Sequence, residues 1–181
     1  MARMTEAEIT QQTLEESRAD AIWDQRCAVL RNAWVQVRYH RRRQRFFDLI
    51  DKLTKSLTVL LGASLLGQAL KDYLPLVASA ISALGLLALV FGYGDRKQSH
   101  KELAEQAANL IAAIETVPAG LLTAGNAAQW GADYARLSAK APPPLKTLTL
   151  ICEREQSSAD GHPNHVALQP WYKRLAADFI S

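Results

Sequence analysis

An unbroken run of 22 uncharged residues, 73–94, constrains the fold of this 181-residue chain more than any other sequence feature. As a helix this run, YLPLVASAISALGLLALVFGYG, would rise about 33 Å, and the hydrocarbon core of a bilayer is about 30 Å thick. Residues 56–70 are also uncharged, and apolar residues continue back to Phe46. The sequence therefore predicts a hairpin of two transmembrane helices, at about residues 50–70 and 74–94. The alternative, a hairpin buried in a soluble helical domain, is disfavoured because buried helices rarely carry so long an apolar run.

Basic residues flank the predicted hairpin on both sides. Positive charge is retained on the cytoplasmic side of membranes, so we expect a multi-pass protein of the bacterial inner membrane with both termini in the cytoplasm and only the tip, Lys71 and Asp72, on the far side. No cleavable signal peptide is expected, because the first twenty residues lack an apolar core. The basic residues expected to contact anionic lipid are Arg41, Arg42, Arg43, Arg45, Arg96 and Lys97. A nucleic-acid patch is the disfavoured alternative, because no base-reading motif accompanies them.

Two apolar stripes lie outside the hairpin, and both repeat at intervals of three and four residues. This spacing is typical of helices that pack through one apolar face. We predict that both membrane helices continue into the cytoplasm as an antiparallel stalk whose stripes face each other; packing against the C-terminal region or a second protomer stays open. The upstream stripe is Trp23, Cys27, Leu30, Trp34 and Val37, and the downstream stripe is Leu103, Ala107, Leu110, Ile114 and Val117.

The C-terminal part is predicted to be small and mainly helical. Trp130, Tyr134 and Leu137 have helical spacing, the prolines at 142–144 form a breaker, and Pro170 opens a last helix. Residues 145–152, LKTLTLIC, predict a short strand. The expected fold is thus all-α apart from that strand, divided into an N-terminal helix (1–45), the hairpin (46–95), a helical region (96–140) and a C-terminal segment (141–181).

Small residues and hydroxyls in the hairpin are candidates for helix packing or for lining a pore. Small residues let membrane helices approach closely, and two helices alone cannot enclose an aqueous path, so conduction would need a homo-oligomer. The alternative for the hydroxyls is a hydrogen bond to a carbonyl of their own helix. The candidates are Gly62, Ala63, Gly67, Ser79, Ser82 and Gly85.

No catalytic, cofactor or metal site is predicted. Cys152, His162 and His165 lack the spacing of a metal site, and no glycine-rich phosphate loop follows a strand. His40 and His100 fall at comparable depths beside the membrane. They could form a pH-responsive pair, or each could be a solvated interfacial histidine.

The aromatic and basic run at 34–47, WVQVRYHRRRQRFF, the two-helix hairpin, and the segment 100–115, HKELAEQAANLIAAIE, together resemble the SLATT family over about residues 20–140. That resemblance implies a bacterial two-transmembrane effector of anti-phage conflict systems, which oligomerises and breaches the inner membrane. It also implies a nucleotide second messenger or a sensor protein as partner. It adds no catalytic residue.

We therefore expect a membrane effector that forms a pore or disrupts the membrane, and not an enzyme. A non-conducting anchor or adaptor is the second hypothesis. A holin-like lysis protein shares the topology but needs little beyond the hairpin, so the large cytoplasmic part disfavours it.

Overall fold

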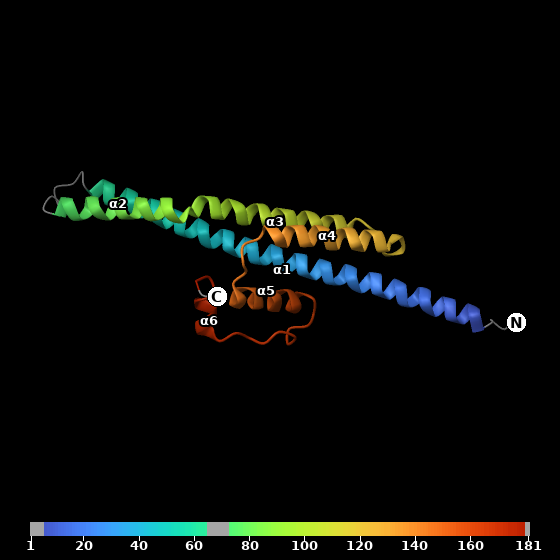
Figure 1. Ribbon diagram of the computed structural model, residues 1–181. Coiled ribbons are helices and arrows are strands. Elements are labelled where there is room, and N and C mark those ends of the chain that lie inside the picture. Colours follow the sequence, from blue (N-terminus) through green and yellow to red (C-terminus); the bar gives the residue numbers. More distant parts are fainter. Residues whose placement is uncertain (1–5, 65–72, 180–181) are drawn as a thin grey trace. The chain divides into compact units, whose positions relative to one another are not determined.

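The computed structural model describes residues 6–64 and 73–179, and every regular element in these ranges is helical (Figure 1). The helices are α1 (Glu6–Ser64), α2 (Leu74–Phe91), α3 (Tyr93–Glu115), α4 (Ala124–Lys140), α5 (Lys146–Ala159) and α6 (Trp171–Leu175), with a short 3-10 helix, η2 (Ala119–Leu121), before α4. The expected all-α class is confirmed. The predicted tip of the hairpin lies outside the described residues.

The predicted strand at 145–152 is wrong, because this segment forms the first half of α5. Leu148, Ile151 and Cys152 are all buried, and their spacing of three and four residues places them on one face of a helix. Short apolar runs fit a strand or a helix equally well by pattern alone. The buried face of α5 continues at Gln156, so packing along a helical face decides the outcome.

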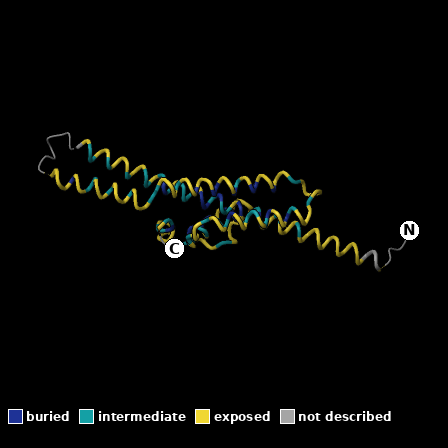
Figure 2. The backbone as a smooth tube through the Cα atoms, turned by 45° about the horizontal axis from the view of Figure 1, so that its top comes forward, coloured by how far each residue is buried: buried dark blue, intermediate teal, exposed yellow. Residues whose placement is uncertain are grey.

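The chain forms two compact units, one of residues 39–102 and the other of residues 1–38 with 103–181. The core of the second unit is built from residues of α1, α3 and α4. Buried residues are dark blue in Figure 2. Thr123 is the N-cap of α4, and its hydroxyl oxygen accepts a hydrogen bond from the Asn126 N–H. The ten core residues are Val29, Ala33, Val37, Leu103, Ala107, Leu110, Ile111, Ile114, Trp130 and Leu137.

Four of the five residues of the downstream stripe lie in this core and the fifth, Val117, is half-buried and packs against it, but the upstream stripe belongs to the core only in part. Val37 is buried and Leu30 is half-buried, whereas Cys27 is exposed, Trp23 is 43% exposed and Trp34 is 38% exposed. The buried face of α1 instead passes through Val29, Ala33 and Val37, about a quarter-turn from the predicted one. The physical reason is that α4 also packs in this core, so two helices and not one determine which face of α1 is covered.

The unit of residues 39–102 contains the apolar helix α2. Pro75 lies in its first turn, where no intrahelical N–H is required, and Gly92 ends it with a left-handed φ of 53° that favours glycine. The helical stretch Leu74–Glu115, which joins α2 and α3, is the one helix among the described residues that is long and apolar enough to cross a membrane. Only 6% of its most apolar 18 residues are buried. Part of the first predicted span lies outside the described residues.

Candidate functional site

The most unusual polar site in the unit of residues 39–102 is a pair of buried histidines. His40 of α1 and His100 of α3 are 1% and 5% exposed, and their Nδ1 atoms lie 2.9 Å apart. At this distance one Nδ1–H donates to the other ring's unprotonated Nδ1, so at least one of the two imidazoles must be neutral. The sequence raised this pairing as one of two alternatives, and the structure shows the paired, buried arrangement.

Aromatic rings enclose the pair. The Phe47 ring stacks on His100 with an interplanar angle of 11° and a centroid separation of 5.6 Å. Tyr39 lies edge-on to His40, with centroids 5.2 Å apart. The Nε2 atom of His40 is buried and has no hydrogen-bond partner among the described residues. A charged imidazole would therefore lose its hydration here without gaining a compensating acceptor at that atom.

Two arginines add positive charge beside the rings. The guanidinium of Arg43 lies 4.6 Å from the centroid of Phe47, and that of Arg96 lies 6.0 Å from it. Burial, with the neighbouring His100, lowers the pKa of His40 from 6.5 to about 4. Burial, with the charges of Arg43 and Arg96, lowers the pKa of His100 to about 4 as well. The neutral pair is therefore the stable form in this fold at neutral pH.

An ion pair also connects α1 and α3 in this unit. Asp48 lies 2.6 Å from Lys97 of α3 and 2.6 Å from Lys52 on its own helix. Hydrogen bonds from Lys52 and Lys97 lower the pKa of Asp48 from 3.8 to about 2, and Asp48 raises the pKa of Lys97. Because these side chains are partly exposed, this ion pair contributes less to the contact between the two helices than a buried pair would. The histidine pair is the buried one.

The other predicted lipid-facing cations are placed along α1 and α3. Arg41, Arg45 and Arg96 are exposed, while Arg42, Arg43 and Lys97 are half-buried. Arg43 and Lys97 thus contribute to contacts within the protein, besides any contact that they make with lipid. The exposed members keep their charge at the surface, as an interaction with anionic headgroups requires.

The predicted packing residues of the hairpin show open faces in the single chain. A methyl group added at Gly62 or Gly85 would meet no atom within 4 Å, and Ala63 is exposed. Ser79 and Ser82 donate hydrogen bonds to the carbonyls of Leu76 and Ala78 on their own helix, so the intrahelical alternative holds for both hydroxyls. Gly67 lies outside the described residues.

In the part of the chain that the structure describes, no three His, Cys, Asp or Glu side chains gather in an arrangement that could hold a metal ion. The histidine pair by itself supplies only two nitrogen ligands, fewer than the three or four protein ligands of zinc sites. Its chemistry is that of a proton-sensitive contact between two helices.

The burial of His40 follows from a stripe that the sequence pattern obscured. Arg26, Val29, Ala33, Val37 and His40 share one face of α1, at spacings of three, four, four and three residues. Arg26 donates a hydrogen bond to the carbonyl of Ile114, which explains how a cation can lie on this face. The spacing of apolar residues alone does not reveal this stripe, because the residues at its two ends, Arg26 and His40, are polar.

Comparison of the chain with protein-family models, with curated proteins and with solved structures gave no match.

Proposed function

We propose that the protein is an integral inner-membrane effector that oligomerises to form a pore or to disrupt the bilayer. The observation that carries the proposal is the apolar helix α2, most of whose large side chains are left uncovered by the described residues. Leu86, Leu89 and Val90 are 62%, 79% and 75% exposed. Such a surface is costly in water and favourable in lipid, at roughly 25 cal/mol for each Å² of apolar surface.

The charge pattern supports a two-span topology with both termini in the cytoplasm. The first span would use the apolar end of α1, where Leu53, Val59 and Leu60 are 60%, 69% and 68% exposed. Arginines precede it, and Arg96 and Lys97 follow α2, which is the distribution expected when both ends face the cytoplasm.

Oligomerisation is supported by the open glycine faces. Among the described residues, nothing lies within 4 Å of a methyl group added at Gly62 or Gly85, and small residues in membrane helices are where a second helix approaches closely. The resemblance to SLATT proteins supports the same proposal and adds an anti-phage role, with a sensor protein or a nucleotide second messenger as the trigger.

In this proposal the neutral histidine pair holds α1 and α3 together in the quiescent state. A signal that separates α1 from α3 at this pair would release the contact that keeps the hairpin in its quiescent arrangement. The pair is a two-state contact, because protonation of both rings replaces a hydrogen bond with a repulsion between two Nδ1–H groups.

A non-conducting membrane anchor is the second candidate, and one observation favours it. The hydroxyls of Ser79 and Ser82 donate hydrogen bonds to carbonyls of their own helix. They therefore need no hydrogen-bond partner in a polar pore. An anchor would insert without altering the permeability of the membrane.

Membrane potential during induced expression in bacteria, followed with a voltage-sensitive dye and with fractionation of the same cells, separates the two candidates. An effector depolarises the cells from the membrane fraction. A Leu84→Lys variant should abolish this, because a charge in the middle of α2 opposes insertion. The matched control is Gln98→Lys, which adds the same charge at an exposed position of α3. Membrane residence with an unchanged potential would favour the anchor.

A further inference from the structure

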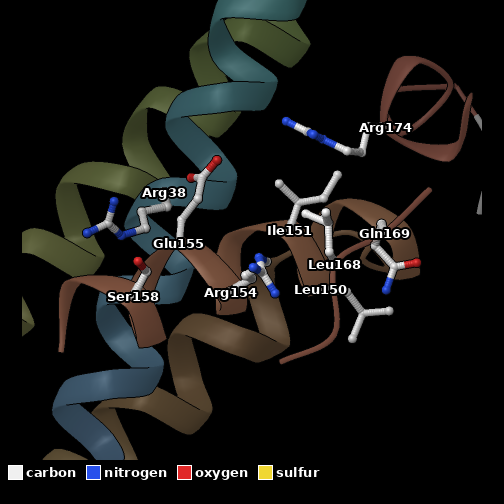
Figure 3. A pocket seen from close by; sticks show the side chains of 9 residues that line it. All are labelled: Arg38, Leu150, Ile151, Arg154, Glu155, Ser158, Leu168, Gln169 and Arg174. Carbon is white, nitrogen blue, oxygen red and sulfur yellow. The ribbon is translucent and has the colours of Figure 1, made fainter. Parts of the chain in front are cut away.

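A pocket of about 370 Å³ lies beside α5, in the unit of residues 1–38 and 103–181 (Figure 3). Its volume falls in the range of small-molecule sites in proteins. Its wall combines three arginines, Arg38, Arg154 and Arg174, with three aliphatic side chains, Leu150, Ile151 and Leu168. Glu155 is the one carboxylate among its lining residues, so the pocket has a formal surplus of positive charge.

Two of the arginines are held in place by hydrogen bonds. Arg38 donates from Nε to Oε1 of Gln156 at 2.9 Å, and Gln156 is only 5% exposed. Gln156 in turn donates to the Asp160 carboxylate at 2.9 Å. Arg154 donates from an Nη to the carbonyl of Val166, which ties the segment after α5 to that helix. A guanidinium has five N–H donors, so each of the two retains several for a ligand.

Arg174 enters the pocket from α6, and Figure 3 shows its guanidinium above Ile151. Among the residues that the structure describes, none forms an ion pair or a side-chain hydrogen bond with this guanidinium. The Glu155 carboxylate offsets only one of the three positive charges around this small pocket, so an added anion would reduce the repulsion between the arginines. Guanidinium groups bind phosphate through paired N–H donors, more specifically than an ammonium group does.

We infer that this pocket binds a small phosphorylated molecule that also has an apolar portion. The phosphate contacts Arg154 and Arg174, with Arg38 adding positive charge, and the apolar portion packs on Ile151 and Leu168. The same chemistry is available from a soluble phosphate ester and from the headgroup region of a lipid. The lining residues alone define this site, so phosphate binding does not depend on the proposed pore or membrane-disrupting activity.

The test is isothermal titration calorimetry on the full chain in an uncharged maltoside detergent. The probes are 1-naphthyl phosphate, inorganic phosphate, and dihexanoyl phosphatidate below its micellar concentration. We expect 1-naphthyl phosphate or dihexanoyl phosphatidate to bind with Kd below about 1 mM and more tightly than inorganic phosphate, because apolar burial adds to the charge interaction. Which of the two binds more tightly identifies the source as soluble or lipid.

Two variants separate the charge from the apolar wall. Arg174→Gln should weaken either organic phosphate about tenfold or more, which is the effect of losing a charge-assisted hydrogen bond. The matched control, Lys173→Gln, removes the same charge from the adjacent residue of α6, which does not line the pocket, and should change Kd less than about threefold. Leu168→Ser should weaken 1-naphthyl phosphate while leaving the affinity for inorganic phosphate unchanged.

Leu168 is 63% exposed and Arg174 is also exposed, so neither substitution should unfold the protein; unchanged thermal unfolding midpoints check this. The inference is overturned if neither organic phosphate binds at millimolar concentration. It is also overturned if Arg174→Gln and Lys173→Gln weaken binding equally, because the effect would then be one of general surface charge.

Discussion

Acidification from pH 7.5 to pH 5 should loosen the contact between α1 and α3 at the histidine pair. The folded protein keeps both imidazoles neutral, with pKa values lowered from 6.5 to about 4, so it binds fewer protons than the opened state between these values. The stability that the neutral pair contributes is therefore complete above about pH 7, and it is lost progressively as the pH falls from 6.5 toward 4.

The expected size of this loss follows from linkage. One histidine with these two pKa values contributes about 2 kcal/mol less at pH 5 than at neutral pH, which is about a 30-fold change in the opening equilibrium. The two rings share a hydrogen bond and titrate as a coupled pair. The value of about 2 kcal/mol therefore describes the first of the two protons that the pair binds on opening. Asp48, whose pKa is about 2, keeps its charge over this range.

Hydrogen exchange measured by mass spectrometry on the full chain in detergent tests the prediction. After correction for the intrinsic effect of pH, amide protection at residues 97–104 should fall about 30-fold at pH 5. The control is a His40→Leu, His100→Leu double variant, which conserves volume approximately and removes both titrating groups. Equal protection at the two pH values in the wild-type protein, or an equal loss in the double variant, would refute the reasoning.

Three further substitutions test the packing. Ile114→Ala removes a side chain with 0% exposure and should cost about 2–5 kcal/mol of stability, seen as a lowered thermal unfolding midpoint; an unchanged midpoint would contradict the described core. Trp34→Ala should lower the midpoint less than Ile114→Ala does, because Trp34 is 38% exposed, and an equal or larger effect would restore the predicted stripe. Asp48→Asn should lower the midpoint at low salt by removing the contacts to Lys52 and Lys97, and the difference should disappear in 1 M NaCl; a salt-independent difference would argue against an electrostatic role.

Patterns that depend on one helix were predictable from the sequence. The uncharged run at 73–94 contains α2, the spacing of Trp130, Tyr134 and Leu137 falls within α4, and the last helix begins directly after Pro170. In each of these cases the signal lies in residues that share a helix, and helical periodicity or proline geometry is enough to detect it.

Features that depend on several helices together were not predictable. The buried face of α1 differs from the predicted face because α4, whose core residues follow those of α1 by about a hundred positions, joins the same core. The segment 145–152 was misassigned because its short apolar run fits either secondary structure. The pairing of His40 with His100 was one of two open alternatives, since a polar residue beside a membrane is buried only if partners from another helix enclose it.

The location of α2 in the bilayer is the central claim, and cysteine labelling in native membranes tests it most directly. Cys27 and Cys152 are replaced by Ala, and single cysteines are introduced by Leu86→Cys in α2 or by Gln98→Cys in α3. Both positions are exposed in the folded chain, so only a membrane should make them differ. We predict that a polar maleimide labels position 98 in inverted inner-membrane vesicles and labels position 86 only after the protein is denatured in detergent. Rapid labelling of position 86 in native vesicles, or recovery of the protein in the soluble fraction, would contradict the account.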